Sequence, residues 1–513
     1  MNDRATSYKA LFSVSLPLVL SMAATTVMEF TDRVFLSNYA IDAIAAALPA
    51  GIAAFLILTF FTGVTTYLNV FVAQYTGAGS SRRIGPCIWQ GIYFSIMAAV
   101  ILVGLSFAAH PIFQLGGHPP EVQKLERIYF RVLCLGGGFN VLGTCLASFF
   151  TGRGKTRPVM LINMIGMAFN IPLDYALING VWFFPEMGIQ GAGIATVCSW
   201  ALIALLYAWL IFDRSNERRY GMLSGRAFDG ELFWRIIRKG VPAALQFTMD
   251  VLAFTFFVFW VGRLGKIELA VSNIALSIQS IAFMPAFGFS MGLSTLVGQS
   301  LGRNDVEGAL RFTRQTITIL LAYTLLLDVL FILAPQWLLS IFILTGREGA
   351  SYRQLLEMGA GVMRIMALFI SFDAMYFTFI GVLKGAGDTR FIMWSIGLAT
   401  LIVMVLPLTI IVEYTEWGLF ASPVMQTVGV LGIGLAFLGA GLVLWSGELR
   451  GVLGWGHLLA LLAARLFGVT LDACRRGLAR ILCDRLRPLC EGQLCRFRRD
   501  QQDPPGLARC LQG

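Results

Sequence analysis

The sequence predicts an all-α polytopic membrane protein, with twelve transmembrane helices built as two parallel six-helix repeats around a central cleft. Three observations support this fold class. Hydrophobic residues make up 57% of the 513 residues and charged residues only 13%, whereas soluble domains carry about 25% charged residues. Apolar stretches such as 159–177 and 312–333 have the roughly 20-residue length that a helix needs to cross a bilayer. Two short motifs also occur once in each half of the chain.

The duplicated motifs are a Gln-x-x-Gly segment and a Gly-x-Gly-x-Thr-Arg segment. Residues 72–77 correspond to 297–302, and residues 152–157 correspond to 385–390. The same 57 residues separate Pro17 from Gln74 and Pro242 from Gln299. A duplicated membrane bundle is the usual build of a secondary transporter, whose binding site lies between the repeats. The sequence therefore indicates a transporter.

Twelve apolar segments define the predicted spans and divide the chain into four regions. The N-terminal six-helix lobe covers 1–213, a hydrophilic and basic inter-lobe linker covers 214–239, and the C-terminal six-helix lobe covers 240–446. The tail at 447–513 is rich in Arg and Cys, which is typical of a disordered segment or of DNA translated in a shifted frame, so we infer no function from it. The predicted spans are 11–37, 44–75, 87–109, 128–150, 158–178, 188–212, 240–262, 270–298, 314–343, 358–382, 391–413 and 417–446.

The distribution of basic residues predicts the orientation. Loops on the side of the N-terminus carry about nineteen Lys and Arg against about eight on the other side, so the N-terminus should be cytoplasmic. Each half has an even number of spans, so both halves enter the membrane in the same direction and form parallel repeats. We expect a multi-pass protein of the cell inner membrane. Its net charge of +10 then reflects basic cytoplasmic loops and not nucleic-acid binding.

Acidic residues inside the apolar segments are the candidate functional residues. A charged side chain at the centre of the membrane costs roughly 2.5–3.5 kcal/mol, so each one needs a reason. The four principal candidates are Asp32, Asp174, Asp250 and Asp373. Glu29 lies one turn before Asp32 and is a secondary candidate, for which an interhelical salt bridge or a wet position near the interface is the favoured explanation.

The neighbours of these acids suggest what they bind. Asn170 lies four residues before Asp174, so both side chains share one helix face. Carboxylate and amide oxygens together offer ligands to a hard cation, or hold a proton. Asp250 and Asp373 have no basic residue within one turn, and an interhelical hydrogen bond is the structural alternative for both.

Several other kinds of site find little support. The three His are scattered and no Cys pair has zinc-site spacing. The Gly-Lys-Thr at 154–156 lacks the preceding glycine of a phosphate loop, because position 149 is Phe149, and the second copy has Asp388 in place of the lysine. No Ser/His/Asp or Cys/His set is arranged for catalysis, so we expect no enzymatic activity and no cofactor.

Taken in order, these features resemble the multidrug and toxic compound extrusion (MATE) transporters, in particular the NorM-like branch. The resemblance covers about residues 8–445 and rests on Pro17 with Asp32, both copies of the two motifs, the pair Asn170 and Asp174, and residues 191–196. It implies a secondary antiporter that exports cationic or amphipathic organic compounds by alternating access, in exchange for Na⁺ or H⁺. We expect a monomer in the lipid bilayer with small-molecule substrates.

The resemblance also implies roles for particular residues. Asp32, Asn170, Asp174 and Thr196 match the N-lobe cation site, which would hold the metal ion Na⁺ if the transporter is Na⁺-coupled. Asp373 matches an acidic residue on the tenth helix. Asp250 stands where NorM-like members usually carry Glu on the seventh helix, and its shorter side chain changes the coordination expected there.

Two other functions find less support in the sequence. A flippase for lipid-linked saccharides, built on a related bundle, would need a basic cavity for pyrophosphate, and Arg33 and Arg364 are the only candidates for its lining. An intramembrane prenyl transferase would need paired Asp-rich motifs to hold Mg²⁺, and none has both members in one loop. The choice between Na⁺ and H⁺ stays open, because oxygen ligands serve either ion.

Overall fold

The computed structural model describes residues 2–114, 118–181, 184–261, 266–342 and 350–399. Throughout these ranges the regular elements are helices, with no strand, as the composition predicts. In chain order they are α1 (Asn2–Tyr39), α2 (Ile41–Thr66), α3 (Leu68–Gly77), η1 (Ser81–Arg83), α4 (Ile84–Ser106), α5 (Ala109–Gln114), α6 (Pro120–Gly152), α7 (Arg157–Asn179), α8 (Ile189–Ile211), α9 (Arg214–Tyr220), η2 (Ser224–Arg226), α10 (Gly230–Val261), α11 (Lys266–Gly302), α12 (Val306–Leu333), α13 (Pro335–Phe342), α14 (Ala350–Ala386) and α15 (Thr389–Ala399).

Length and composition make this a multi-pass membrane protein. In the described ranges, eight helical segments are long and apolar enough to cross a membrane, and six of them lie in the first lobe. The predicted span 391–413 is described only as far as residue 399. The predicted span 417–446 and the tail 447–513 lie outside the described residues.

The second bundle repeats the order and packing of the first. In the first bundle α6 packs against α2, α3 and α4, and α1 packs against α7. In the second, α14 packs against α11 and α12, and α10 packs against α15. A short helix follows at the same place in both, α5 after α4 and α13 after α12. The duplication seen in the sequence is therefore also a duplication of tertiary structure.

Two predicted boundaries are wrong for local reasons. The span predicted at 314–343 is divided, because α12 ends at Leu333 and α13 starts at Pro335. Proline disfavours helical backbone in the residue before it, here Ala334. The span predicted to begin at 240 lies within a helix that begins earlier, at Gly230, because the Asp229 carboxylate accepts a hydrogen bond from the Leu232 amide at 3.0 Å and caps the helix.

The two bundles are held together by crossed pairs of equivalent helices. Helix α1 packs against α11, and its counterpart α10 packs against α2. Glycine allows both crossings, since close backbone approach needs small side chains. An added Cβ at Gly63 would lie 2.8 Å from the Cα of Ala244, and one at Gly292 would lie 3.1 Å from the Cα of Ser15.

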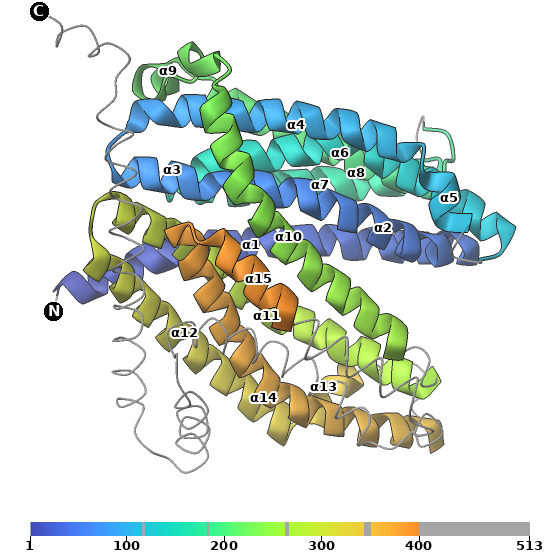
Figure 1. Cartoon of the computed structure of the whole chain (residues 1–513). Helices are drawn as coiled ribbons and strands as arrows, with labels where there is room; N and C mark the ends of the chain where they lie inside the picture. The colour runs from blue at the N-terminus through green and yellow to red at the C-terminus, as the bar shows by residue number, and fades with distance from the viewer. Residues whose placement is uncertain (1, 115–117, 182–183, 262–265, 343–349, 400–513) are drawn as a thin grey trace, which may run out of the picture.

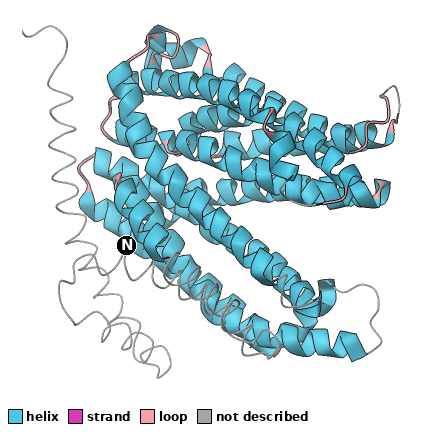
Figure 2. Ribbon diagram, turned by 45° about the vertical axis from the view of Figure 1, so that its right-hand side comes forward, coloured by secondary structure: helices cyan, strands magenta, loops and turns pink. Residues whose placement is uncertain are grey.

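The bundles meet at one end of the molecule and diverge toward the other, as Figures 1 and 2 show. The joined end carries α3, the N-terminus and the start of α10, and we define it as residues 74–83, 152–157, 299–306 and 385–390. The spread end carries α5 and the C-terminal end of α10 (Figure 1). Basic side chains of the joined end are Arg82, Arg83, Arg153, Lys155, Arg157, Arg303 and Arg390.

Candidate functional site

Three helices of the first lobe bring the predicted polar side chains together. Asp32 lies on α1, Asn170 and Asp174 lie one turn apart on α7, and Thr196 lies on α8. Helix α7 packs against both α1 and α8. All four residues are buried, with Asn170 and Asp174 fully inaccessible. We call this group of four the N-lobe site.

The polar atoms of the N-lobe site are largely unsatisfied. The Thr196 hydroxyl donates to Asp32 Oδ2 at 3.2 Å, and the Asp32 and Asp174 carboxylates are close enough to interact electrostatically. Asp32 Oδ1, both Asp174 oxygens and both amide atoms of Asn170 lack a partner among the described residues. Buried polar atoms are nearly always hydrogen-bonded, so this group is suited to an additional ligand.

Backbone chemistry places the site between α7 and α8. Pro172 sits inside α7, two residues before Asp174, and has no N–H to donate to the carbonyl one turn earlier. Gly191 in the first turn of α8 lies against α7, where an added Cβ would be 2.5 Å from the Leu177 carbonyl oxygen. The direct contact of the two backbones brings Thr196 within reach of the α1 carboxylate.

Glu29 takes no part in the hydrogen bonds of the N-lobe site. No described residue buries the Glu29 side chain, which is exposed, and the Arg33 side chain is exposed as well. The sequence favours an interhelical salt bridge for Glu29, or a hydrated position near the membrane interface. No ion pair of Glu29 is formed within the described ranges, and its role stays a prediction.

The second lobe holds its acids differently. Asp250 on α10 accepts hydrogen bonds at Oδ2 from the Tyr376 hydroxyl on α14, at 3.0 Å, and from the Gln246 amide one turn earlier on α10. The interhelical hydrogen bond considered for Asp250 is therefore present. Asp373 lies one turn before Tyr376, is 5% exposed, and has an Oδ1 with no partner in the described part of the molecule.

Aromatic rings adjoin these second-lobe acids. Phe377 packs edge-to-face against Phe283 with ring centroids 4.6 Å apart, and against Phe287 at 5.7 Å. Tyr376 is in edge contact with Phe377 at 5.0 Å. The second lobe thus sets carboxylates beside a cluster of packed aromatic rings, a combination that suits cations carried on apolar molecules.

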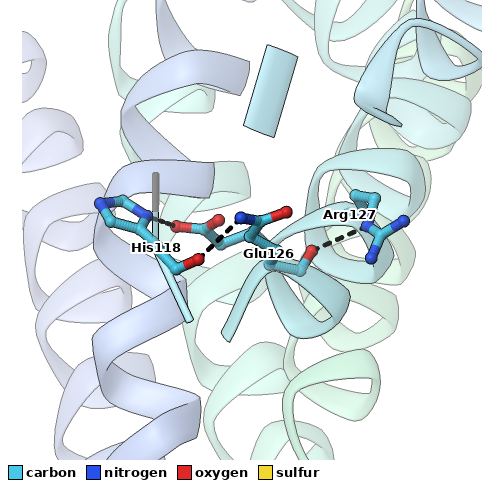
Figure 3. Close-up of polar contacts among 4 residues, drawn as sticks. His118, Glu126 and Arg127 are labelled. Carbon is cyan, nitrogen blue, oxygen red and sulfur yellow. Dashed lines mark hydrogen bonds and ion pairs between the residues drawn. The ribbon is translucent and has the colours of Figure 1, made fainter. Parts of the chain in front are cut away.

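Glu126 is an informative contrast to the candidate acids. It is fully buried at the start of α6, and its carboxylate meets His118 Nδ1 at 2.7 Å (Figure 3). The Gln123 amide donates to the His118 carbonyl at 2.7 Å, and the Arg127 guanidinium donates to the Gln123 carbonyl at 3.0 Å. This acid has a basic partner, as a structural ion pair should.

The candidate acids are not directly bonded to a basic side chain in the described ranges, although Lys384 on α14 lies close enough to Asp250 to interact with it electrostatically. Asp32, Asp174, Asp250 and Asp373 form no ion pair with Lys or Arg among the residues described. Within the same ranges no cluster of three or more His, Cys, Asp or Glu could hold a metal ion. Any ion held at the N-lobe site would therefore have mixed oxygen ligands from carboxylate, amide and hydroxyl groups.

Comparison with known proteins places this chain in a family. The sequence model of the MatE family matches residues 17–176 and 242–409, more than half of the chain and one segment in each lobe. The chain belongs to the MatE family. This confirms the resemblance drawn from the two motifs and the intramembrane acids.

Relatives of this MatE chain include proteins named for multidrug resistance. It is 27% identical over 387 residues to a probable multidrug resistance protein NorM of Thermotoga maritima, covering 74% of this chain and 80% of the relative. It is 25% identical over 443 residues to the multidrug resistance protein NorM of Aliivibrio fischeri, covering 84% and 90%.

Solved structures share the fold. One, described as the outward-facing conformation of a multidrug resistance MATE family transporter of the MOP superfamily, has a TM-score of 0.73 at 20% identity, covering 89% of this chain and 96% of that chain. A eukaryotic MATE transporter has a TM-score of 0.72 at 17% identity, covering 94% and 99%.

The structure of this MatE chain adds two residues that the sequence analysis missed. Gln246 precedes Asp250 by four residues and Tyr376 follows Asp373 by three, so helical spacing would have placed them on the same faces as the acids. A further acid, Asp328 on α12, accepts a hydrogen bond from the Ser371 hydroxyl at 2.6 Å. It joins α12 to α14.

Proposed function

We propose that this MatE chain is a multidrug exporter, a secondary antiporter of the cell inner membrane that works as a monomer. It carries cationic or amphipathic organic compounds outward in exchange for Na⁺ or H⁺. The NorM relatives support the substrate class. The observation that supports cation coupling is the buried carboxylate pair of Asp32 and Asp174, with three of its four oxygens unpartnered and no basic neighbour bonded to it within the described ranges.

The pair supports coupling because it is costly without a positive charge. Two unit charges 4 Å apart repel by about 4 kcal/mol at an effective dielectric of 20. A shared proton removes one of the two charges, and a Na⁺ ion bound by oxygens of Asp32, Asn170, Asp174 and Thr196 likewise offsets one charge and attracts both carboxylates. Entry of the cation therefore changes the charge that the first lobe presents to a cationic substrate.

Substrate and cation then compete for the same negative charge. A cationic drug held near carboxylates in an apolar cavity loses its charge partner once those carboxylates bind H⁺ or Na⁺. The packed rings of Phe283, Phe287 and Phe377, on the helices of the second lobe, would supply apolar contact for the rest of the drug molecule. Release outward follows from loss of the electrostatic part of binding.

The same scheme fixes the sides of the membrane. The joined end carries the basic side chains, so it faces the cytoplasm by the positive-inside rule, and the N-terminus lies on that side. Alternating access then requires the lobes to separate at the joined end and to approach at the spread end. In this proposal, the described structure corresponds to a conformation closed toward the cytoplasm.

Efflux from cells lacking their own drug pumps tests the proposal. We expect Asp32→Asn and Asp373→Asn to abolish export of ethidium and norfloxacin at unchanged expression in the membrane. Asp42→Asn, at the exposed start of α2, is the matched control and should transport like the parent. Full efflux in both Asp32→Asn and Asp373→Asn would rule the scheme out.

A further inference from the structure

The duplicated Gln-x-x-Gly and Gly-x-Gly motifs meet each other across the two lobes. Gln74 at the end of α3 donates its amide hydrogen to the Gly385 carbonyl of α14 at 3.1 Å. Gln299 at the end of α11 donates to the Gly152 carbonyl of α6 at 2.8 Å. Each bond joins a glutamine of one lobe to a glycine of the other, so the two contacts are equivalent under the internal repeat.

Helix ends explain why these carbonyls accept the bonds. The last four carbonyls of an α-helix have no partner within the helix, and Gly152 ends α6 while Gly385 is the next-to-last residue of α14. In both lobes the two carbonyls just before this glycine accept bonds from amides of the following turn. The glycine carbonyl has no acceptor role within its own turn, and the glutamine amide of the opposite lobe donates a hydrogen bond to it.

The turn itself is the same in both copies. Gly154 has φ +71° and Gly387 has φ +86°, a left-handed conformation that favours glycine. This second glycine of each motif turns the chain sharply away from the helix axis. The first glycine's carbonyl therefore stays accessible to the facing glutamine.

The glycine of each Gln-x-x-Gly motif lies directly against the backbone of the glutamine in the other copy. An added Cβ at Gly77 would lie 2.0 Å from the Gln299 carbonyl oxygen, and one at Gly302 would lie 2.3 Å from the Gln74 carbonyl oxygen. Equivalent segments of the two repeats thus contact each other, as equivalent surfaces do in a two-fold symmetric interface.

A further polar contact between the lobes joins α3 to α11. The Asn69 side-chain amide donates to the Thr295 hydroxyl at 3.0 Å, and that hydroxyl lies 3.1 Å from Asn69 Oδ1. Both residues are buried. Hydrogen bonds of Gln74, Gln299 and Asn69 therefore connect the two lobes at and near the joined end.

We propose that Gln74 and Gln299 are positioning residues of the cytoplasmic gate, and that their two cross-lobe hydrogen bonds must both break for substrate to enter. The inference rests on the proposed alternating-access function, because only a transport cycle requires the joined end to open. A duplicated gate of two equal bonds holds the lobes shut symmetrically and releases them together. It also accounts for the presence of both motifs in both halves.

Hydrogen exchange of the purified full-length chain tests the gate, because amide exchange follows the population of the open form. We expect Gln74→Ala and Gln299→Ala each to raise exchange rates about fivefold in the last turns of α3 and α11, because the net contribution of one hydrogen bond is about 1 kcal/mol. The double variant should exceed either single one. At the spread end, exchange in α5 should fall, because opening one end closes the other.

A matched control uses the same chemistry without crossing the lobes. The buried Gln90 amide donates to the Ala227 carbonyl of the inter-lobe segment at 3.1 Å. Gln90→Ala should leave exchange in the last turns of α11 unchanged. Its effect should be confined to residues around 224–230.

Two results overturn the inference. Unchanged exchange at the joined end in the double variant would show that the bonds do not hold the gate. Faster exchange at both ends would show a general loss of stability and no shift between conformations. Drug efflux is measured in parallel: a parent chain that moves no drug refutes the proposed function, while the exchange pattern still decides the gate.

Discussion

Replacing Asp174 by Asn removes one of two acidic groups that the first lobe holds side by side. The substitution keeps the size of the side chain, and the site is fully buried, so little else changes. Neither Asp174 oxygen has a hydrogen-bond partner among the described residues. The stability of the cation-free protein should therefore reflect the cost of placing two carboxylates together.

The size of the effect follows from that cost. Repulsion of about 4 kcal/mol at an effective dielectric of 20 is an upper value, because protonation or water entry relieves part of it. We expect Asp174→Asn to raise the free energy of unfolding by roughly 1–4 kcal/mol in Na⁺-free buffer at alkaline pH, and the Tm by about 2 °C or more. Efflux should be lost, since cation binding no longer changes the charge of the site.

Thermal unfolding with and without the coupling ion is the assay. Addition of Na⁺, or of acid if H⁺ is the coupling ion, should stabilise the parent as binding to the folded state requires. Asp174→Asn should lose most of that response, and the exposed Asp42→Asn should keep it. A less stable Asp174→Asn that still responds to the cation and still exports drug would show that Asp174 neither repels Asp32 nor binds the coupling ion.

Three further predictions test other parts of the structure. Asp373→Asn should abolish efflux with no loss of thermal stability, because this buried acid has an unpartnered oxygen; a marked fall in Tm would show a structural role. His118→Ala should cost roughly 1–3 kcal/mol in unfolding experiments, because it leaves Glu126 buried without its partner, and adding Glu126→Gln should restore most of it. Gly191→Ala should reduce transport at least tenfold in vesicle assays by pushing α8 off α7, whereas Gly104→Ala, with nothing within 4 Å of its added Cβ, should be neutral.

The fold was predictable because its signals are long and repeated. Span length and the matched motif spacing carry through whole helices, so the all-helical fold and the order of the helices in the described ranges follow the prediction. Helix ends were less predictable, since single side chains decide them. The cap from Asp229 started α10 ten residues early, and Pro335 divided the ninth predicted span.

The site was only partly predictable from residues. Spacing alone pairs Asn170 with Asp174 on one face, but the meeting of Asp32 with Asp174 depends on helix packing across the lobe and came from the family resemblance. Tyr376 could have been found by counting one turn from Asp373. The gate contacts could not, because the carbonyl left free at Gly152 depends on how the following turn uses its neighbours.

Norfloxacin uptake into inverted membrane vesicles, under separately imposed Na⁺ and pH gradients, tests cation-coupled export most directly. Inverted vesicles present the cytoplasmic side outward, so a lumen loaded with Na⁺ or acid should drive drug inward. Cation-coupled export predicts uptake with at least one of the two gradients in the parent and none in Asp32→Asn. Uptake that ignores both gradients, or that persists in Asp32→Asn, would contradict it.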